Sequence, residues 1–288
     1  VFDVEITNIF AKSENENPIS VSKCFVKENV SENNGRLVCA SKICMTITEI
    51  DYKVFSQFYT WEQIRIGRMI CYRKEYLPTE FVESILHLYE MKTKLKGVKG
   101  KEVEYLNSKE MLNSCYGMCV TNPLRDEIVC DGETWDVEHL TGEKQLEMLN
   151  KYNDSKNRFL FYPWGIYVTA YARRNLFTGI SECGDDYIYS DTDSVKIMNG
   201  DAHKEYFKLY NDLAQQKLRA ACKFHKIPFE KVEPVTIKGI AKPLGVWDYE
   251  GRYTRFKTLG AKRYMIEEEN ALTVDGKNYN YSMTVSGV

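Results

Sequence analysis

The sequence has 288 residues, with 43% hydrophobic and 28% charged side chains and a formal net charge of −2. This length allows one large domain or two small ones, and the composition is ordinary for a globular protein. A charge so close to zero excludes a chain that binds polyanions over its whole surface, so any nucleic-acid contact would have to come from local basic clusters.

Cysteine usage and hydropathy narrow the class further. The nine cysteines form no C-x-x-C pair, which favours a reduced protein in the cytoplasm. Cys222 and His225 lie three residues apart without a second ligand pair, so a zinc site is not expected. The longest apolar stretch, residues 159–172, contains Pro163 and Gly165 and is too short to span a membrane. No membrane partner is therefore expected.

The first part of the chain has the pattern of strands. Residues 1–47 alternate apolar and polar side chains in the runs VFDVEITNIF, ISVSKCFV and ICMTIT. Thr48 and Asp51 have the spacing of a capping box, so a short helix should follow before WEQIRIGRMICYRK returns to strand. Because the chain opens at Val1, directly in strand sequence, we expect it to be a fragment of a longer protein.

A helical hairpin is predicted next. Pro78 and Thr79 begin one helical pattern, and a second runs from Glu102 through Tyr116. Between them, KTKLKGVKGK places five lysines and two glycines in ten residues. This lysine-rich tip is either a basic contact surface or simply a solvated turn.

The remaining elements complete an α+β pattern. Residues 119–163 are polar and mixed, WGIYVTAYARRNLFTGI predicts a helix, and strands flank a turn around Asp191. A further helix should span roughly residues 203–225. The last sixty residues predict the strands TIKGI, RYTRFKTL and KRYMIEE, and a hairpin at Asp275–Gly276, a typical D-G turn.

Three clusters could carry chemistry, and the first is KEMLNSCYG. On a helix, Lys109, Asn113, Tyr116 and Gly117 share one face. An ammonium, an amide, a phenol ring and a gap suit an anionic ligand with a flat end. The alternative is a surface face that ends in a glycine.

The second cluster is YSDTDS, which contains Asp191 and Asp193. Side chains two apart on a strand point to the same side, so both carboxylates should face one site, where a cation is needed to keep both ionised. An EF-hand loop is excluded because Lys196 and Ala202 stand where it needs glycine and glutamate. Magnesium is the better candidate, and a tight turn without a ligand is the alternative.

The third cluster is TRFKTLGAKRYM. It carries four cations and interleaves two aromatic residues: Arg255, Lys257, Lys262, Arg263, Phe256 and Tyr264. Such alternation on a strand suits a nucleic-acid backbone. The alternative is an edge strand protected by its charges.

In this order the three clusters resemble the family B DNA polymerases. KEMLNSCYG is similar to the motif K-x-x-x-N-S-x-Y-G, YSDTDS to Y-x-D-T-D-S, and KRY to K-x-Y. WGIYVTAYAR and residues 244–265 are most similar to the protein-primed branch of phages and linear plasmids. The resemblance covers residues 107–117 and 164–266 by motif, and residues 1–100 only by pattern.

The resemblance implies a role for each motif residue. Asp193 would be the main ligand of two magnesium or manganese ions, with Asp191 as its catalytic neighbour. Lys109 would hold the phosphates of the incoming dNTP, and Asn113 and Tyr116 would border the new base pair. Gly117 would be the fourth nucleotide-binding residue. The residues expected to contact the primer–template DNA are Lys262, Tyr264, Arg263 and Lys257. Such chemistry is a phosphoryl transfer in which the protein positions groups and screens charge.

The resemblance also implies a division of the chain. Residues 1–52 and 164–288 would form the palm, and residues 79–118 the helical-hairpin fingers. Residues 53–78 and 119–163 would take the place of two insertions that in the protein-primed branch contact a terminal priming protein and encircle the DNA. A phage or mobile-element polymerase would work in the cytoplasm of a bacterial host.

One part of the expected site is not in the sequence. The family's first motif, D-x-x-S-L-Y-P, does not occur in the 288 residues, and Asp3 lacks the residues that should follow it. We therefore expect this motif and the nuclease domain upstream and the thumb downstream, and an inactive fragment as it stands. Two alternatives stay open: a non-catalytic nucleic-acid-binding relic, and another metal-dependent phosphoryl-transfer enzyme with an acidic hairpin.

Overall fold

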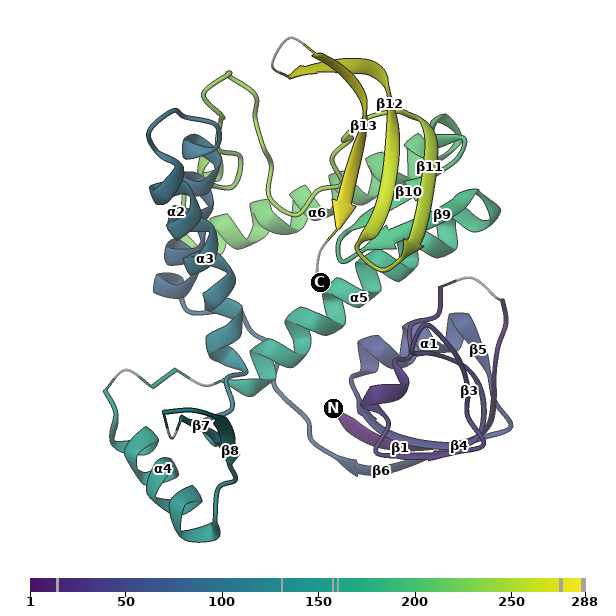
Figure 1. The fold of residues 1–288 in the computed structure, drawn as a ribbon, viewed down its shortest axis with the longest axis vertical. Coiled ribbons are helices and arrows are strands. Elements are labelled where there is room, and N and C mark those ends of the chain that lie inside the picture. Colours follow the sequence, from purple (N-terminus) through teal and green to yellow (C-terminus); the bar gives the residue numbers. More distant parts are fainter. Residues whose placement is uncertain (14–15, 131, 157, 160, 275–276, 286–288) are drawn as a thin grey trace. The chain divides into compact units, whose positions relative to one another are not determined.

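The structure, a computed structural model, describes residues 1–13, 16–130, 132–156, 158–159, 161–274 and 277–285 (Figure 1). It contains helices and antiparallel sheets, which confirms the predicted α+β class. The chain divides into two compact units. The first unit comprises Val1–Arg73, Ala170–Phe224 and Pro243–Val288, and the second comprises Lys74–Thr169 and His225–Lys242.

The first unit opens with an antiparallel sheet centred on strand β1. Its members are β1 (Phe2–Ala11), β2 (Val26–Glu28), β3 (Ser31–Asn33), β4 (Arg36–Ile47), β5 (Tyr59–Thr60) and β6 (Gln63–Met69). β1 pairs with β4, β5 and β6, and in this register Ile6 lies opposite both Ile43 and Ile64. The predicted alternation in VFDVEITNIF thus places Val4 and Ile6 in the core.

Two helices pack on this sheet and close the core of the first unit. Val54 and Phe55 of α1 (Glu49–Phe58) and Phe177 and Ile180 of α5 (Tyr162–Cys183) join the buried cluster of sheet residues. The rings of Phe58 and Phe177 meet edge to face, with centroids 5.5 Å apart. Residues far apart in the chain therefore share one hydrophobic core.

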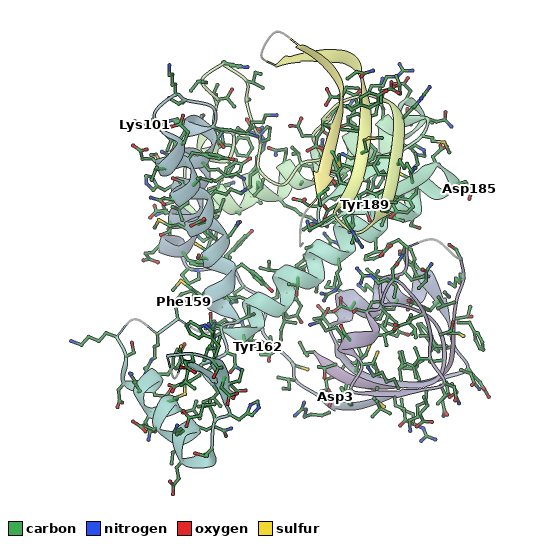
Figure 2. The ribbon with its side chains drawn as sticks, in the orientation of Figure 1. Asp3, Lys101, Phe159, Tyr162, Asp185 and Tyr189 are labelled. Carbon is green, nitrogen blue, oxygen red and sulfur yellow. The ribbon has the colours of Figure 1, made fainter. Side chains whose placement is uncertain are left out.

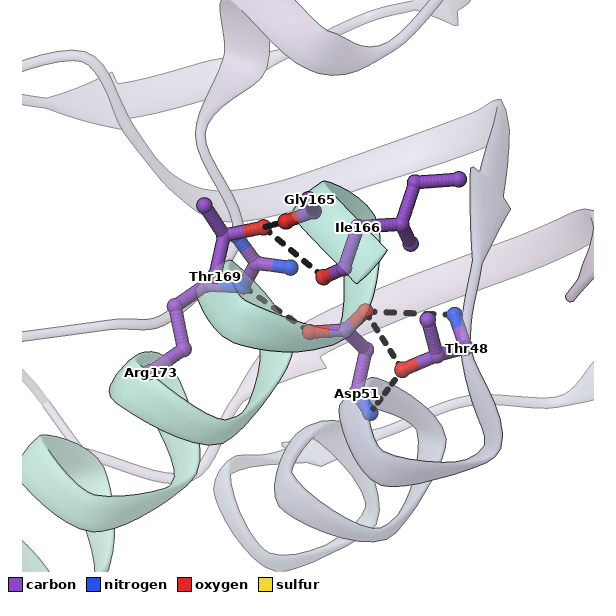
Figure 3. A network of polar contacts seen from close by, with 6 residues as sticks. All are labelled: Thr48, Asp51, Gly165, Ile166, Thr169 and Arg173. Atoms are coloured by element: carbon purple, nitrogen blue, oxygen red, sulfur yellow. Dashed lines mark hydrogen bonds and ion pairs between the residues drawn. The ribbon is translucent and has the colours of Figure 1, made fainter. Parts of the chain in front are cut away.

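The predicted capping box of α1 is confirmed and extends to α5. The Asp51 carboxylate accepts hydrogen bonds from the Thr48 amide at 3.1 Å and the Thr48 hydroxyl at 2.9 Å, and Thr48 Oγ1 accepts from the Asp51 amide. Arg173 of α5 forms an ion pair with the same carboxylate at 2.8 Å (Figure 3). The side chain of Asp51 is only 5% exposed, whereas that of Arg173 is 38% exposed, so a buried carboxylate pairs with a partly exposed guanidinium.

The rest of the first unit contains a hairpin, a helix and a second sheet. The hairpin is β9 (Tyr187–Asp191) with β10 (Ser194–Ile197), and the helix is α6 (Lys204–His225). The sheet comprises β11 (Tyr253–Gly260), β12 (Arg263–Val274) and β13 (Lys277–Val285), in that order. Val274 pairs with Lys277, while the predicted Asp275–Gly276 turn itself lies outside the described residues.

The second unit contains the predicted helical hairpin. It is formed by α2 (Thr79–Leu95) and α3 (Glu102–Cys119), and Lys101 lies at its tip (Figure 2). Gly97 and Gly100 adopt left-handed φ angles of +76° and +80° there, which explains the two glycines of this turn. The unit also contains the hairpin of β7 (Glu127–Cys130) and β8 (Trp135–Glu138), and helix α4 (Gly142–Asp154).

Close packing within the second unit depends on Gly165 in the first turns of α5. A Cβ atom placed on Gly165 would lie 2.0 Å from Cγ1 of Val120, so only glycine fits beside the end of α3. Thr169, one turn later, donates its hydroxyl to the Ile166 carbonyl at 2.9 Å (Figure 3). The hydroxyl satisfies a carbonyl of its own helix.

Residues 225–242 run along α2 within the same unit. The Tyr89 hydroxyl donates to the Lys242 carbonyl at 3.0 Å, and Lys231 pairs with Glu90 at 2.9 Å. The Thr79 hydroxyl and His225 Nδ1 lie 2.9 Å apart at the first turn of α2. This segment therefore braces α2 at both its first turn and its middle.

Two predicted strands are wrong. ISVSKCFV forms the 3₁₀ turn Val21–Lys23 and reaches strand only at Val26, because the hydroxyls of Ser20 and Ser22, 2.9 Å apart, favour a turn. TIKGI forms a turn in which the Gly239 amide donates to the Thr236 carbonyl at 2.9 Å. Gly239, at φ +75°, interrupts the extended backbone.

The predicted domain boundaries can be placed on these elements and units. The boundary between residues 52 and 53 falls inside α1, and β5 and β6 pair with β1, so residues 53–73 share one unit with residues 1–52. Residues 119–163 lie in the second unit with the helical hairpin. The roles of 53–78 and 119–163 as insertions stay predictions. In the part of the chain that is described, no helix is long and apolar enough to cross a membrane.

Candidate active site

The two aspartates flank a strained turn at the end of the β9–β10 hairpin. Asp191 is the last residue of β9, and the Asp193 amide donates to the Asp191 carbonyl at 2.6 Å, which closes a three-residue γ-turn over Thr192. Thr192 adopts φ +55°, a rare conformation for a β-branched residue. Asp193 therefore lies in a turn and not on a strand. The alternation of side chains along a strand, on which the prediction relied, does not apply to this pair of aspartates.

A lysine pairs with the first of the two aspartates. Lys262 Nζ donates to Asp191 Oδ1 at 2.8 Å, and the Thr192 hydroxyl donates to the same oxygen at 2.9 Å. The hydrogen bond from Lys262 is the main reason why the pKa of Asp191 lies below its usual range. Asp191 is therefore ionised at neutral pH.

The backbone around Lys262 holds this ammonium in place. Lys262 lies between β11 and β12 at φ +55°, and its amide donates to the Tyr189 hydroxyl at 2.9 Å. The ring of Tyr189, labelled in Figure 2, packs against those of Phe256 and Tyr264, each with centroids 5.3 Å away. Strand β9 thus fixes both partners of the ion pair, Asp191 by its end and Lys262 through Tyr189.

Backbone strain concentrates at this place. The non-glycine residues with positive φ among those described are Asn8, Asn29, Asn34, Asn199, Thr192, Lys226 and Lys262. Asparagine tolerates this conformation, whereas threonine and lysine rarely adopt it. Two of the three that are not asparagine, Thr192 and Lys262, therefore contact the same carboxylate, that of Asp191.

The basic strands differ from the pattern seen in the sequence. Phe256 and Tyr264 stack on one another with centroids 5.6 Å apart and an interplanar angle of 28°, on the side that also packs against Tyr189. Lys257 lies opposite Met265, on the other face of the sheet. The interleaved aromatic rings are therefore packing residues of the sheet, and the exposed face carries the cations without them.

The predicted face of α3 is exposed. Lys109, Asn113 and Tyr116 form no hydrogen bond or ion pair with any other residue that the structure describes, and Tyr116 is 39% exposed. A Cβ atom placed on Gly117 would meet nothing within 4 Å. No described part of the chain therefore fills the space beside Gly117. This face belongs to the second unit, and the aspartates belong to the first.

Two contributors to the site were missed in the sequence. The Tyr189 hydroxyl and the strained Thr192 both lie inside the motif YSDTDS, but neither a hydrogen bond to a residue 73 positions away nor a φ angle is visible in a motif. Among the described residues no group of three or more His, Cys, Asp or Glu side chains could hold a metal ion. A metal at Asp191 and Asp193 would therefore need further oxygen ligands.

Sequence relatives identify the group to which these motifs point. The chain is 26% identical to a DNA polymerase of Bacillus phage B103 over 241 residues, which are 83% of this chain and 34% of that protein. It is 28% identical to a DNA polymerase of Bacillus phage phi29 over 172 residues, 59% of this chain and 23% of that protein. The chain is a distant homologue of the phi29-type DNA polymerases. It spans about a third of the length of the B103 relative, and no protein-family model matches it.

The comparison of folds agrees with the comparison of sequences. A structure of phi29 DNA polymerase with primer–template DNA and incoming nucleotide matches all of the chain and 43% of that protein, with a TM-score of 0.59. The identity in this comparison is 16%, so it concerns the fold alone. The resemblance inferred from the three motifs is thus confirmed at the level of the polymerase group.

Proposed function

We propose that the chain is the palm and fingers part of a template-directed DNA polymerase that transfers nucleotides from dNTPs to a primer 3′ end. One observation carries this proposal: the strained turn that presents Asp191 and Asp193 at the tip of a hairpin, beside Lys262. Two further observations support the proposal. The phi29-type relatives are DNA polymerases, and the exposed face of α3 offers a second contact surface.

The donor set suits magnesium or manganese. Carboxylate oxygens are the ligands that these hard cations prefer, and they retain several waters that substrate phosphates can replace. Asp191 is ionised, and Asp193 is exposed and forms no side-chain hydrogen bond or ion pair with another described residue. Asp193 would be the main ligand and Asp191 its neighbour. Two bound ions would stabilise the attacking and leaving oxygens of the phosphoryl transfer.

The other motif residues would bind the substrates. Lys109 would pair with the dNTP phosphates as a point charge, and Asn113 and Tyr116 would border the new base pair. Gly117 would admit the partner to close approach, which agrees with the empty space above it.

The primer–template DNA would lie along the cations of the β11–β12 hairpin. Lys257 and Arg263, which form no ion pair within the described chain, would meet its phosphates, and Lys262 and Tyr264 would steady the primer end. The ring of Tyr264 is stacked on Phe256, so its contribution would come from its hydroxyl edge. A terminal priming protein is a further proposed partner, and it would bind through residues 53–78 and 119–163. The proposed location is the cytoplasm of a bacterial host.

The test is primer extension by the 288-residue chain and by the complete product of its reading frame, with Asp193→Asn and Asp185→Asn in parallel. Asp185 precedes β9 in the turn Gly184–Asp186 and serves as the matched control. Magnesium-dependent extension that is lost in D193N and kept in D185N would support the proposal. Extension that survives in D193N would refute the assigned role of Asp193, and template binding without extension in either protein would favour the non-catalytic relic.

A further inference from the structure

The ion pair between Lys262 and Asp191 places an ammonium where the proposed metal would bind. Asp191 Oδ1 accepts from both Lys262 and Thr192, at 2.8 and 2.9 Å. The hydrogen bond to Asp191 is the main reason why the pKa of Lys262 is raised, and the charge of Asp193 adds a smaller contribution. The Lys262 ammonium is therefore the counter-ion of Asp191.

This contact is built by the fold, because the backbone of Lys262 is fixed on both sides. Its amide is bound to the Tyr189 hydroxyl at 2.9 Å. The Thr258 hydroxyl spans the turn, since it accepts from the Gly260 amide at 3.0 Å and lies 3.3 Å from the Arg263 carbonyl. A flexible surface lysine loses side-chain entropy when it forms an ion pair, and anchoring its backbone reduces that loss.

We propose that Lys262 and a divalent cation compete for Asp191, so that Lys262 lowers the metal affinity of the chain until its ammonium is drawn away. This inference rests on the proposed function, since it takes Asp191 and Asp193 as the metal ligands. The ammonium neutralises one carboxylate and repels a second cation brought to the same oxygen. It thereby keeps the Asp191 carboxylate ionised and the strained turn ordered in the absence of metal.

The competition connects metal binding with DNA binding. A phosphate of the primer–template that attracts the Lys262 ammonium would leave Asp191 Oδ1 free for the cation. By linkage, a metal at Asp191 would in turn make Lys262 available to the phosphate. The same side chain would thus delay assembly of the catalytic site until the primer is present.

The test measures Mn²⁺ binding to the 288-residue chain without DNA, by electron paramagnetic resonance of the free ion. The variants are Lys262→Met, which keeps the length of the side chain without its charge, and Lys262→Arg, which keeps the charge. Lys208→Met removes an exposed lysine of α6 and is the matched control. Asp193→Asn reports on the proposed metal site itself, and thermal unfolding checks that each variant is folded.

The expected result is Mn²⁺ binding that is tighter by roughly three- to tenfold in K262M. Solvent weakens the repulsion between a partly exposed ammonium and a divalent ion but does not abolish it. K262R and K208M should bind as the unmodified chain does, and D193N should bind more weakly. Unchanged or weaker binding in K262M, with binding still dependent on Asp193, would overturn the competition alone. Binding that is indifferent to Asp193 would overturn the metal site and the competition with it.

Discussion

Replacing Gly117 by alanine should stabilise the chain, whereas the same replacement at Gly165 should destabilise it. Both glycines lie inside helices, where alanine is favoured over glycine by about 1 kcal/mol. At Gly117 a new Cβ would meet nothing within 4 Å. G117A should therefore raise the free energy of unfolding by roughly 0.5 to 1 kcal/mol.

The surroundings reverse the sign at Gly165. Its new Cβ would lie 2.0 Å from Cγ1 of Val120 and 3.5 Å from Cβ of Cys119, which is buried. Overpacking of this kind costs about 1 to 3 kcal/mol, and the gain in helix propensity offsets part of it. G165A should therefore lower the free energy of unfolding by about 1 to 2 kcal/mol.

Urea denaturation followed by far-ultraviolet circular dichroism measures both effects, with equal slopes m as the condition for comparing midpoints. The proposed function adds a second expectation for G117A, weaker dNTP binding in spite of higher stability, because the methyl group would fill the gap that the nucleotide approaches. A G117A variant that is less stable than the unmodified chain would contradict the finding that the space beside Gly117 is empty. A neutral G165A would refute the tight contact with Val120.

Three further effects follow from single polar groups. Asp51→Ala removes the carboxylate half of the capping box of α1 and the partner of Arg173, which is 38% exposed, and should lower the free energy of unfolding by about 1 to 3 kcal/mol in urea denaturation. Tyr59→Phe leaves the Leu37 carbonyl without its buried donor and should lower it by about 1 to 2 kcal/mol. Lys94 and Lys231 lower the pKa of Glu90 to about 2, so Glu90 stabilises the chain fully above its ordinary pKa of 4.5 and loses this effect as the pH falls toward 2. Glu90→Gln should flatten that part of an acid-unfolding curve.

Elements specified by neighbouring residues could be predicted from the sequence. The cap formed by Thr48 and Asp51 needs only residues three apart, and the hairpin of α2 and α3 needs two helical patterns with glycines between them. Helix α5 begins and ends within three residues of its predicted run. In each case the side chains that determine the element lie inside it.

Predictions that relied on alternation alone failed where turn-forming residues were present. ISVSKCFV alternates like a strand, yet the hydroxyls of Ser20 and Ser22 lie in a 3₁₀ turn. The predicted strand TIKGI fails as well, because Gly239 occupies a left-handed conformation that a strand does not contain. A period of two is necessary for a half-buried strand but does not exclude a turn.

The candidate site shows the same division between local and distant information. The sequence identified the residue types of all three motifs and predicted a cation for the two aspartates. It did not indicate that Lys262, 71 residues away along the chain, pairs with Asp191. Contacts between Tyr189, Phe256 and Tyr264 likewise depend on how β9 meets β11 and β12, which no local pattern contains.

The strained residues support the proposed role of these distant contacts. A hairpin that needed only to reverse the chain would be more stable with asparagine or glycine at position 192, since positive φ angles disfavour threonine. Such a conformation costs on the order of 1 to 3 kcal/mol and persists only where the surroundings enforce it. Thr192 and Lys262 both have it, and both bind Asp191 Oδ1. Stability is therefore given up twice around one carboxylate oxygen, which agrees with the proposed role of Asp191 as a ligand held in a fixed place.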